Sequence, residues 1–143
     1  ITEDLEVRRK MVEKRLRKLN GMKGDVAAPL LAGDPSPDIL LLSWGSTLGA
    51  VMEARETLRQ RGVHVANLHF PQVWPLVPER FAPILNSASK LVMVEGNATG
   101  QFAGLLRRET GIAITHRILR YDGLPIVPRD ILEGLKNQGL IRW

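Results

Sequence analysis

Short apolar segments alternate with helical patterns over most of the chain, and this alternation limits the possible folds more than any other feature. Four apolar segments of strand length lie at residues 39–43, 63–70, 91–95 and 112–119. Three helical patterns follow the first, third and fourth of them, at 48–60, 99–110 and 128–137. The first strand is continuously apolar, as expected when a sheet is covered on both faces. The order predicts a three-layer α/β/α sandwich with a mostly parallel sheet.

The first part of the chain has a different charge from the rest. Residues 1–23 contain eight basic and four acidic side chains, which accounts for most of the net charge of +5. Residues 2–19 keep apolar positions at helical spacing, and a Pro- and Gly-rich stretch follows at 32–38. Because the chain also lacks an initial Met, we expect residues 1–37 to be a basic helix and linker from a preceding domain. Residues 38–143 are predicted to be the α/β domain.

Residue types exclude several kinds of site. The chain has no cysteine, so it cannot form disulfides, thiolate nucleophiles or cysteine-ligated clusters. His64 and His69 lie an odd number of positions apart on one predicted strand and therefore point to opposite faces. We expect no metal site and no catalytic residue, since neither a catalytic triad nor paired carboxylates stand out. No apolar stretch could span a bilayer and no signal peptide is visible, so we expect a cytoplasmic protein without a membrane partner.

The first predicted strand-to-helix corner combines glycines with hydroxyl groups. Gly45, Ser46 and Thr47 follow the strand, and Gly49 lies just inside the helix. The corner has neither the Lys of a P-loop nor a G-x-G-x-x-G pattern. Its hydroxyl groups can cap the helix while Gly49 allows close packing on the sheet, or its N–H groups can receive an anion.

The second corner is richer in polar groups. Glu95 ends the strand, and Asn97, Thr99 and Gln101 follow it across two glycines. These groups are more than a helix cap needs, even with Thr99 as the cap, so they favour an interaction site. A stand-alone nucleotide- or phosphate-binding module remains the alternative. A basic nucleic-acid binder is a third hypothesis, but the basic charge is confined to one aromatic-poor helix and no nucleic-acid motif accompanies it, so we expect no nucleic-acid partner.

Five separated motifs resemble the C-terminal domain of the alpha subunit of 2-oxoacid:ferredoxin oxidoreductases. They are MVEKRLRKL, LLSWGSTLGAVMEA, LHFPQVWPL, VMVEGNATGQFAGLLRRETG and RYDGLPIVPRDI. The match covers nearly the whole chain in the family's order. The resemblance implies a fold like that of the transketolase C-terminal domain.

The resemblance also implies a function for the parent enzyme. Such an enzyme decarboxylates a 2-oxoacid, with 2-oxoglutarate favoured here, and makes acyl-CoA, CO2 and reduced ferredoxin. It uses thiamine diphosphate, magnesium, an iron–sulfur cluster and coenzyme A. The resemblance implies that these groups are held by the beta subunit and the preceding domain, so this domain alone is expected to bind no cofactor and to be inactive.

The same resemblance suggests which residues meet other parts of the enzyme. The expected partners are the preceding domain, the beta subunit and, through the holoenzyme, ferredoxin. Candidate contacts with a neighbouring domain or a ligand are the corner residues Gly45, Ser46, Thr47, Glu95, Asn97 and Gln101. The helix at residues 5–19 is expected to dock its apolar stripe on the preceding domain.

Overall fold

Five strands form one sheet at the centre of the computed structural model, which describes residues 3–143. The strands are β1 (Leu30–Gly33), β2 (Ile39–Trp44), β3 (Val65–Phe70), β4 (Lys90–Glu95) and β5 (His116–Leu119). Their order across the sheet is β1-β3-β2-β4-β5. All neighbours are parallel except β1, which runs antiparallel to β3. The predicted mostly parallel sheet is therefore confirmed.

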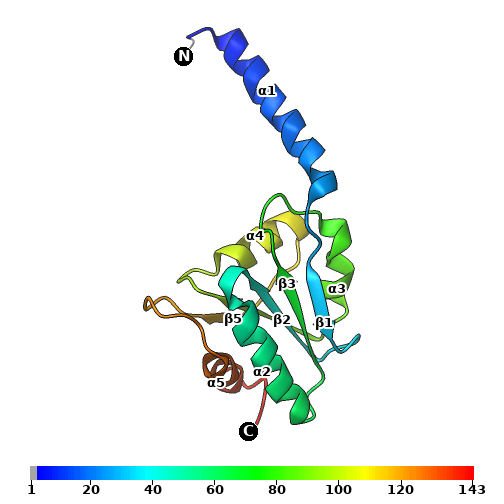
Figure 1. Cartoon of the computed structure of the whole chain (residues 1–143), viewed down its shortest axis with the longest axis vertical. Helices are drawn as coiled ribbons and strands as arrows, with labels where there is room; N and C mark the ends of the chain where they lie inside the picture. Colours follow the sequence, from blue (N-terminus) through cyan, green and yellow to red (C-terminus); the bar gives the residue numbers. More distant parts are fainter. Residues whose placement is uncertain (1–2) are drawn as a thin grey trace.

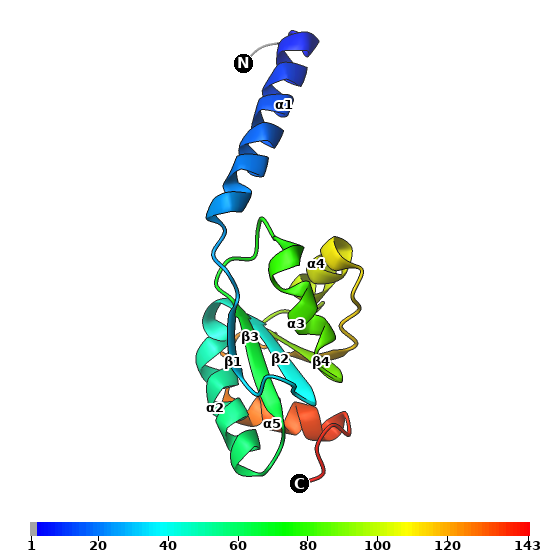
Figure 2. The same cartoon turned by 90° about the vertical axis from the view of Figure 1, so that its right-hand side faces the viewer.

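Helices cover both faces of this sheet (Figures 1 and 2). The helices are α2 (Leu48–Gln60), α3 (Ala82–Asn86), α4 (Gln101–Thr110) and α5 (Pro128–Asn137). Alternate residues of a strand point to opposite faces. Leu40 and Leu42 of β2 accordingly belong to the core cluster shared with α3 and α4, whereas Ile39 and Leu41 belong to the cluster shared with α2 and α5. The α/β/α sandwich is thus confirmed.

The predicted elements differ from the structure mainly at their ends. The bounds of α2 and α5 agree with the prediction, whereas α4 begins two residues later than expected and β3 begins at Val65. The last strand is shorter than the predicted 112–119 because residues 112–115 do not pair with β4. Their apolar pattern arises from packing, since Ile114 is buried in the cluster with α3 and α4. Met52 of α2 is 45% exposed, because the buried stripe of this helix runs through Val51, Ala54 and Leu58.

Strand β1 lies inside the segment that the sequence assigned to a linker. Its four side chains are all exposed, so it has no alternating pattern that sequence analysis could detect. At Gly33, where φ is +113°, a Cβ atom would lie 2.6 Å from the carbonyl oxygen of Val65. The close approach of β1 to β3 therefore requires glycine there. The sheet begins before residue 38, where the α/β domain was expected to start; the assignment of residues 1–37 to a preceding domain stays a prediction.

The first helix, α1 (Leu5–Met22), projects away from the sheet and its covering helices (Figures 1 and 2). It begins at the cap residue Asp4, whose carboxylate accepts hydrogen bonds from the backbone N–H groups of Glu6 and Val7. Its apolar residues do not touch the domain core, and α1 has no buried residue. Docking of its stripe on another domain therefore stays a prediction. No helix within residues 3–143 is both long and apolar enough to cross a bilayer.

Candidate functional site

Three loops at the carboxyl ends of β2, β4 and β5 surround a cleft of about 630 Å³. In open α/β sheets, ligands bind at this end of the strands. The end of β2 contributes Trp44, the turn after it contributes Ser46 and Thr47, and the loop after β4 contributes Gly96. The segment from Arg120 to Ile126 forms the remaining wall. The two corners predicted from the sequence thus lie at one edge of the sheet.

The first corner does not serve as a helix cap. Thr47 is buried and its hydroxyl group donates to the carbonyl oxygen of Trp44 at 2.8 Å, not to an acceptor in α2. No side chain caps the start of α2, and a Cβ atom at Gly49 would have nothing within 4 Å. The capping and close-packing explanation of this corner is therefore wrong. Gly45, with φ of +59°, and Ser46 are exposed at the turn.

At the second corner, Glu95 is completely buried and its carboxylate has four hydrogen-bond donors. They are the backbone N–H groups of Phe102 (2.9 Å) and Ala103 (2.9 Å), Nδ2 of Asn97 (2.7 Å) and Nε1 of Trp44 (3.3 Å). A negative charge is stabilised at a helix N-terminus, where N–H groups lack intrahelical partners. The buried side chain of Glu95 therefore caps α4, and its bond with Trp44 links this helix to the first corner.

The amide of Asn97 organises the turn between β4 and α4. Its Oδ1 atom accepts hydrogen bonds from the N–H groups of Thr99 (3.2 Å), Gly100 (2.8 Å) and Gln101 (3.2 Å). Thr99, predicted as a plausible cap, is not the cap, because the N-cap position is occupied by Gly100 at φ +66°. The side chain of Gln101 is exposed and that of Asn97 is half-buried. Of the predicted contact residues, Gly45, Ser46 and Gln101 are on the surface, whereas Thr47 and Glu95 support it from below.

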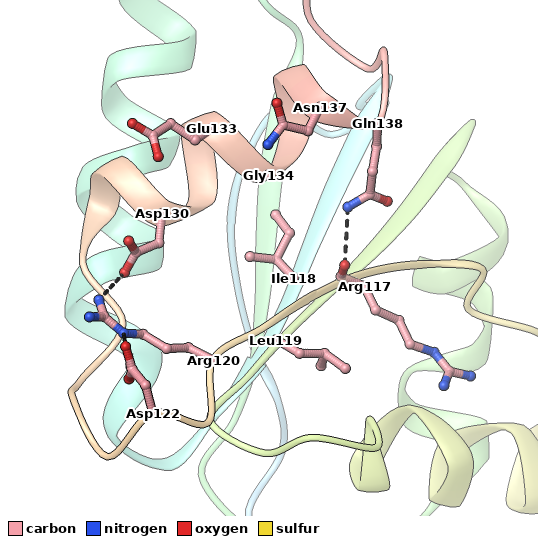
Figure 3. A pocket seen from close by; sticks show the side chains of 10 residues that line it. All are labelled: Arg117, Ile118, Leu119, Arg120, Asp122, Asp130, Glu133, Gly134, Asn137 and Gln138. Carbon is pink, nitrogen blue, oxygen red and sulfur yellow. Dashed lines mark hydrogen bonds and ion pairs between the residues drawn. The ribbon is translucent and has the colours of Figure 1, made fainter.

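The loop after β5 forms much of the cleft. Tyr121 is 72% exposed and Leu124 is 63% exposed. Arg120 fixes this loop, since its guanidinium group bonds Asp122 at 2.9 Å and Asp130 of α5 at 2.6 Å (Figure 3). The sequence signal was the unusual content of apolar residues, YDGLPIV, in a strand-to-helix connection.

The acidic groups of this loop are held ionised. The hydrogen bond from Arg120 lowers the pKa of Asp122, with a further contribution from the N–H group of Leu124. The pKa of Asp130 is lowered first by the N–H group of Val127 and then by Arg120. The single guanidinium group of Arg120 pairs with both carboxylates, so neither acid is unpaired, although the three groups together keep one negative charge.

A second hollow, of about 490 Å³, lies between β5 and α5 and shares Arg120 with the cleft (Figure 3). Gln138 donates from Nε2 to the carbonyl oxygen of Arg117 at 3.0 Å, on the open edge of β5. The Nδ1 atom of His116 lies 3.2 Å from the Oε1 atom of the same glutamine. Side chains thus cover part of the edge strand, which is a common protection against unwanted strand pairing.

The histidines occupy different environments and do not form a site together. His69 is buried beside Ser43, with 2.9 Å between Nδ1 and Oγ, and burial lowers its pKa. His64 is exposed and bonds Asp34 at 2.8 Å; this hydrogen bond raises the pKa of His64. Within residues 3–143, no group of three or more His, Asp or Glu side chains could hold a metal ion.

Comparisons with known proteins agree with this architecture. Residues 31–112 match the family model for the transketolase C-terminal domain. The 2-oxoacid:ferredoxin oxidoreductase subunit alpha of Saccharolobus solfataricus is 32% identical over 141 residues, which cover 95% of this chain and 22% of the relative. The 2-oxoglutarate oxidoreductase subunit KorA of Mycobacterium tuberculosis is 35% identical over 99 residues, 68% of this chain and 14% of the relative. The chain therefore spans about a fifth of the length of the curated relatives it matches first.

Two solved structures share the fold. One is the 2-oxoglutarate:ferredoxin oxidoreductase of Magnetococcus marinus with 2-oxoglutarate, coenzyme A and succinyl-CoA bound, at TM-score 0.82 and 25% identity over 96% of this chain and 24% of that chain. The other is the alpha chain of a probable 2-oxoacid ferredoxin oxidoreductase of Thermoplasma acidophilum, at TM-score 0.55 and 31% identity. That match covers 78% of this chain and 96% of the other. The chain therefore belongs to the transketolase C-terminal domain family, as a member related to the alpha subunits of 2-oxoacid:ferredoxin oxidoreductases.

Proposed function

We propose that this chain is an assembly domain of a 2-oxoacid:ferredoxin oxidoreductase alpha subunit and that it contributes no catalytic residue. One observation carries the proposal: Arg120, Thr47 and the underlying Glu95 are bonded within the chain, while apolar side chains are exposed at the rim of the cleft. Tyr121 and Leu124 form this apolar rim, beside the exposed turn at Gly45 and Ser46. An exposed apolar surface bordered by polar groups is typical of a contact with protein.

The second corner is a poor site for a phosphate group. A phosphate at a helix N-terminus needs free N–H groups and an absence of competing negative charge. Glu95 already takes the N–H groups of Phe102 and Ala103, and Asn97 takes those of the preceding turn. The buried carboxylate would also repel a second anion. This argument favours protein contact over the nucleotide-binding alternative.

The parent enzyme is proposed to convert a 2-oxoacid to acyl-CoA and CO2 with reduction of ferredoxin. The named relatives support 2-oxoglutarate as the substrate. An iron–sulfur cluster does not fit this chain because it has no cysteine, and a diphosphate does not fit the second corner because its helix N–H groups are occupied. For magnesium, no group of three or more His, Asp or Glu side chains within residues 3–143 could hold a metal ion. We assign these groups and coenzyme A to other parts of a cytoplasmic enzyme, in which the preceding domain and the beta subunit contact this domain and ferredoxin binds through the holoenzyme.

The proposal is tested by assembly of the full alpha subunit with its beta subunit. Leu124→Asp places a charge in the apolar rim and is expected to weaken assembly, measured by analytical ultracentrifugation. Met52→Asp is the matched control, because Met52 is an exposed apolar residue of α2 outside the cleft. Equal assembly of both variants would contradict the contact.

A second test uses the isolated chain. It is expected neither to reduce an acceptor dye with 2-oxoacid and coenzyme A nor to bind ATP, NAD or coenzyme A tightly in calorimetric titrations. Turnover by the isolated chain would overturn the non-catalytic assignment, and tight binding of a nucleotide would favour the alternative function.

A further inference from the structure

Helix α1 presents an apolar stripe that nothing in residues 3–143 covers. Leu5 is 79% exposed and Leu16 is 56% exposed, and only Leu19 is half-buried. The ion pairs of the helix are internal, Lys10 with Glu6 at 2.9 Å and Arg9 with Glu13 at 3.9 Å. Helices in proteins gain most of their stability from packing of an apolar face. The helix thus has the properties of an element that packs against another surface.

The base of this helix is fixed to the domain. Val26 is buried, and its carbonyl oxygen accepts a hydrogen bond from Nη1 of Arg80 at 2.7 Å. The next residue, Ala27, donates from its backbone N–H to Oε1 of Gln72 at 3.3 Å. These contacts hold the segment that follows α1, so the helix leaves the domain from a defined point.

The charges beside the stripe are distributed unequally. An α-helix turns about 100° per residue, which brings Leu5, Val12, Leu16 and Leu19 onto one narrow face. Arg8 and Arg15 border one side of this face together with Asp4, which precedes Arg8 by four positions, whereas Arg15 has no acidic residue three or four positions away. On the other side, Arg9 is paired with Glu13. One border of the stripe is therefore cationic and the other is close to neutral.

We infer that α1 docks into a groove elsewhere in the alpha subunit that has an apolar floor and an acidic wall facing Arg8 and Arg15. The inference rests on the proposed function and gives the chemistry of the partner surface. Charge complementarity sets the orientation of the helix in this groove, because reversal of the helix would bring the neutral border against the acidic wall. The curated relatives contain ample chain for such a surface, since about four fifths of their length lies outside the match.

Hydrogen exchange of α1 in the assembled enzyme tests the inference. Its amides are expected to be protected in the assembled enzyme and to exchange freely in the isolated chain. The double variant Arg8→Glu/Arg15→Glu is expected to accelerate their exchange by about tenfold in the enzyme. The matched control, Lys14→Glu/Arg17→Glu, changes the net charge equally on the face opposite the stripe and is expected to leave exchange unchanged.

The outcomes separate the inference from the proposed function. If the wild-type subunits assemble and α1 exchanges freely, or if both double variants behave alike, the acidic groove is wrong while the assembly function stands. If the wild-type subunits do not assemble, the proposed function fails. Binding of the isolated chain to phosphatidylserine vesicles, together with an unprotected α1 in the enzyme, would identify an anionic lipid surface as the partner and would overturn the inference.

Discussion

Replacement of Glu95 by glutamine tests whether one buried carboxylate holds both corners of the cleft. Glutamine keeps the shape but places an NH2 group where one oxygen accepts, so at least one of the four donors around Glu95 loses its acceptor. An unsatisfied buried donor costs about 1–3 kcal/mol, and a bond to a charged acceptor exceeds a neutral one by about 1 kcal/mol. The amide also escapes the desolvation of the buried carboxylate, which opposes this loss. We expect a net decrease of about 2–3 kcal/mol in the free energy of unfolding.

Urea denaturation of the chain at neutral pH, followed by tryptophan fluorescence, measures this change. The control is Glu53→Gln, because Glu53 is exposed on α2 and, within residues 3–143, only its backbone carbonyl oxygen accepts a bond from another side chain, that of Thr57. We expect the control to stay within about 0.5 kcal/mol of the wild type. If Glu95→Gln also stays within that range, the carboxylate does not hold the corners and the structural argument for the cleft fails.

Four further outcomes are expected. Gly134→Ala should destabilise the fold by about 1–2 kcal/mol in urea denaturation, because its Cβ atom would lie 2.8 Å from Cγ1 of Ile118. Gly104→Ala should stabilise the fold by about 0.5–1 kcal/mol, since a Cβ atom at this helical position would have nothing within 4 Å. If Gly134→Ala proved more stable than Gly104→Ala, the close packing at Gly134 would be refuted. Burial lowers the pKa of His69 from 6.5, so stability should fall as the pH decreases below 6.5, and His69→Gln should reduce this dependence. The pKa of His64 is raised, so this residue should stabilise the fold below pH 6.5, and the stabilisation should be lost as the pH rises through the folded-state pKa. If the free energy of unfolding of His64→Gln depends on pH with the same slope as that of the wild type, this expectation is wrong.

Local patterns were sufficient for the elements buried between layers. The bounds of α2 and α5 were predicted correctly, because each helix has a clear apolar stripe and a clear boundary residue. Gly62, at φ +78°, follows α2, and Pro128 opens α5 at its first turn. The continuous apolar run of β2 likewise reflects its position at the centre of the sheet.

Contacts between distant segments were not readable from local patterns. Strand β1 has four exposed side chains, and its identity depends on backbone pairing with β3. Glu95 stands at the end of an apolar strand, where the sequence cannot distinguish a surface carboxylate from an internal cap. The role of Arg120 depends on Asp130, which lies ten positions away on α5. In each case the missing information was which segments meet in space.

The pairing of β1 gives α1 a mechanical connection to the centre of the domain. The chain runs from α1 into β1, and all four β1 residues pair with the interior strand β3. Hydrogen bonds of an antiparallel pair lie perpendicular to the strands. Tension transmitted along β1 therefore loads these bonds in shear, so that they resist together, whereas a load that peeled the strand away would break them in sequence.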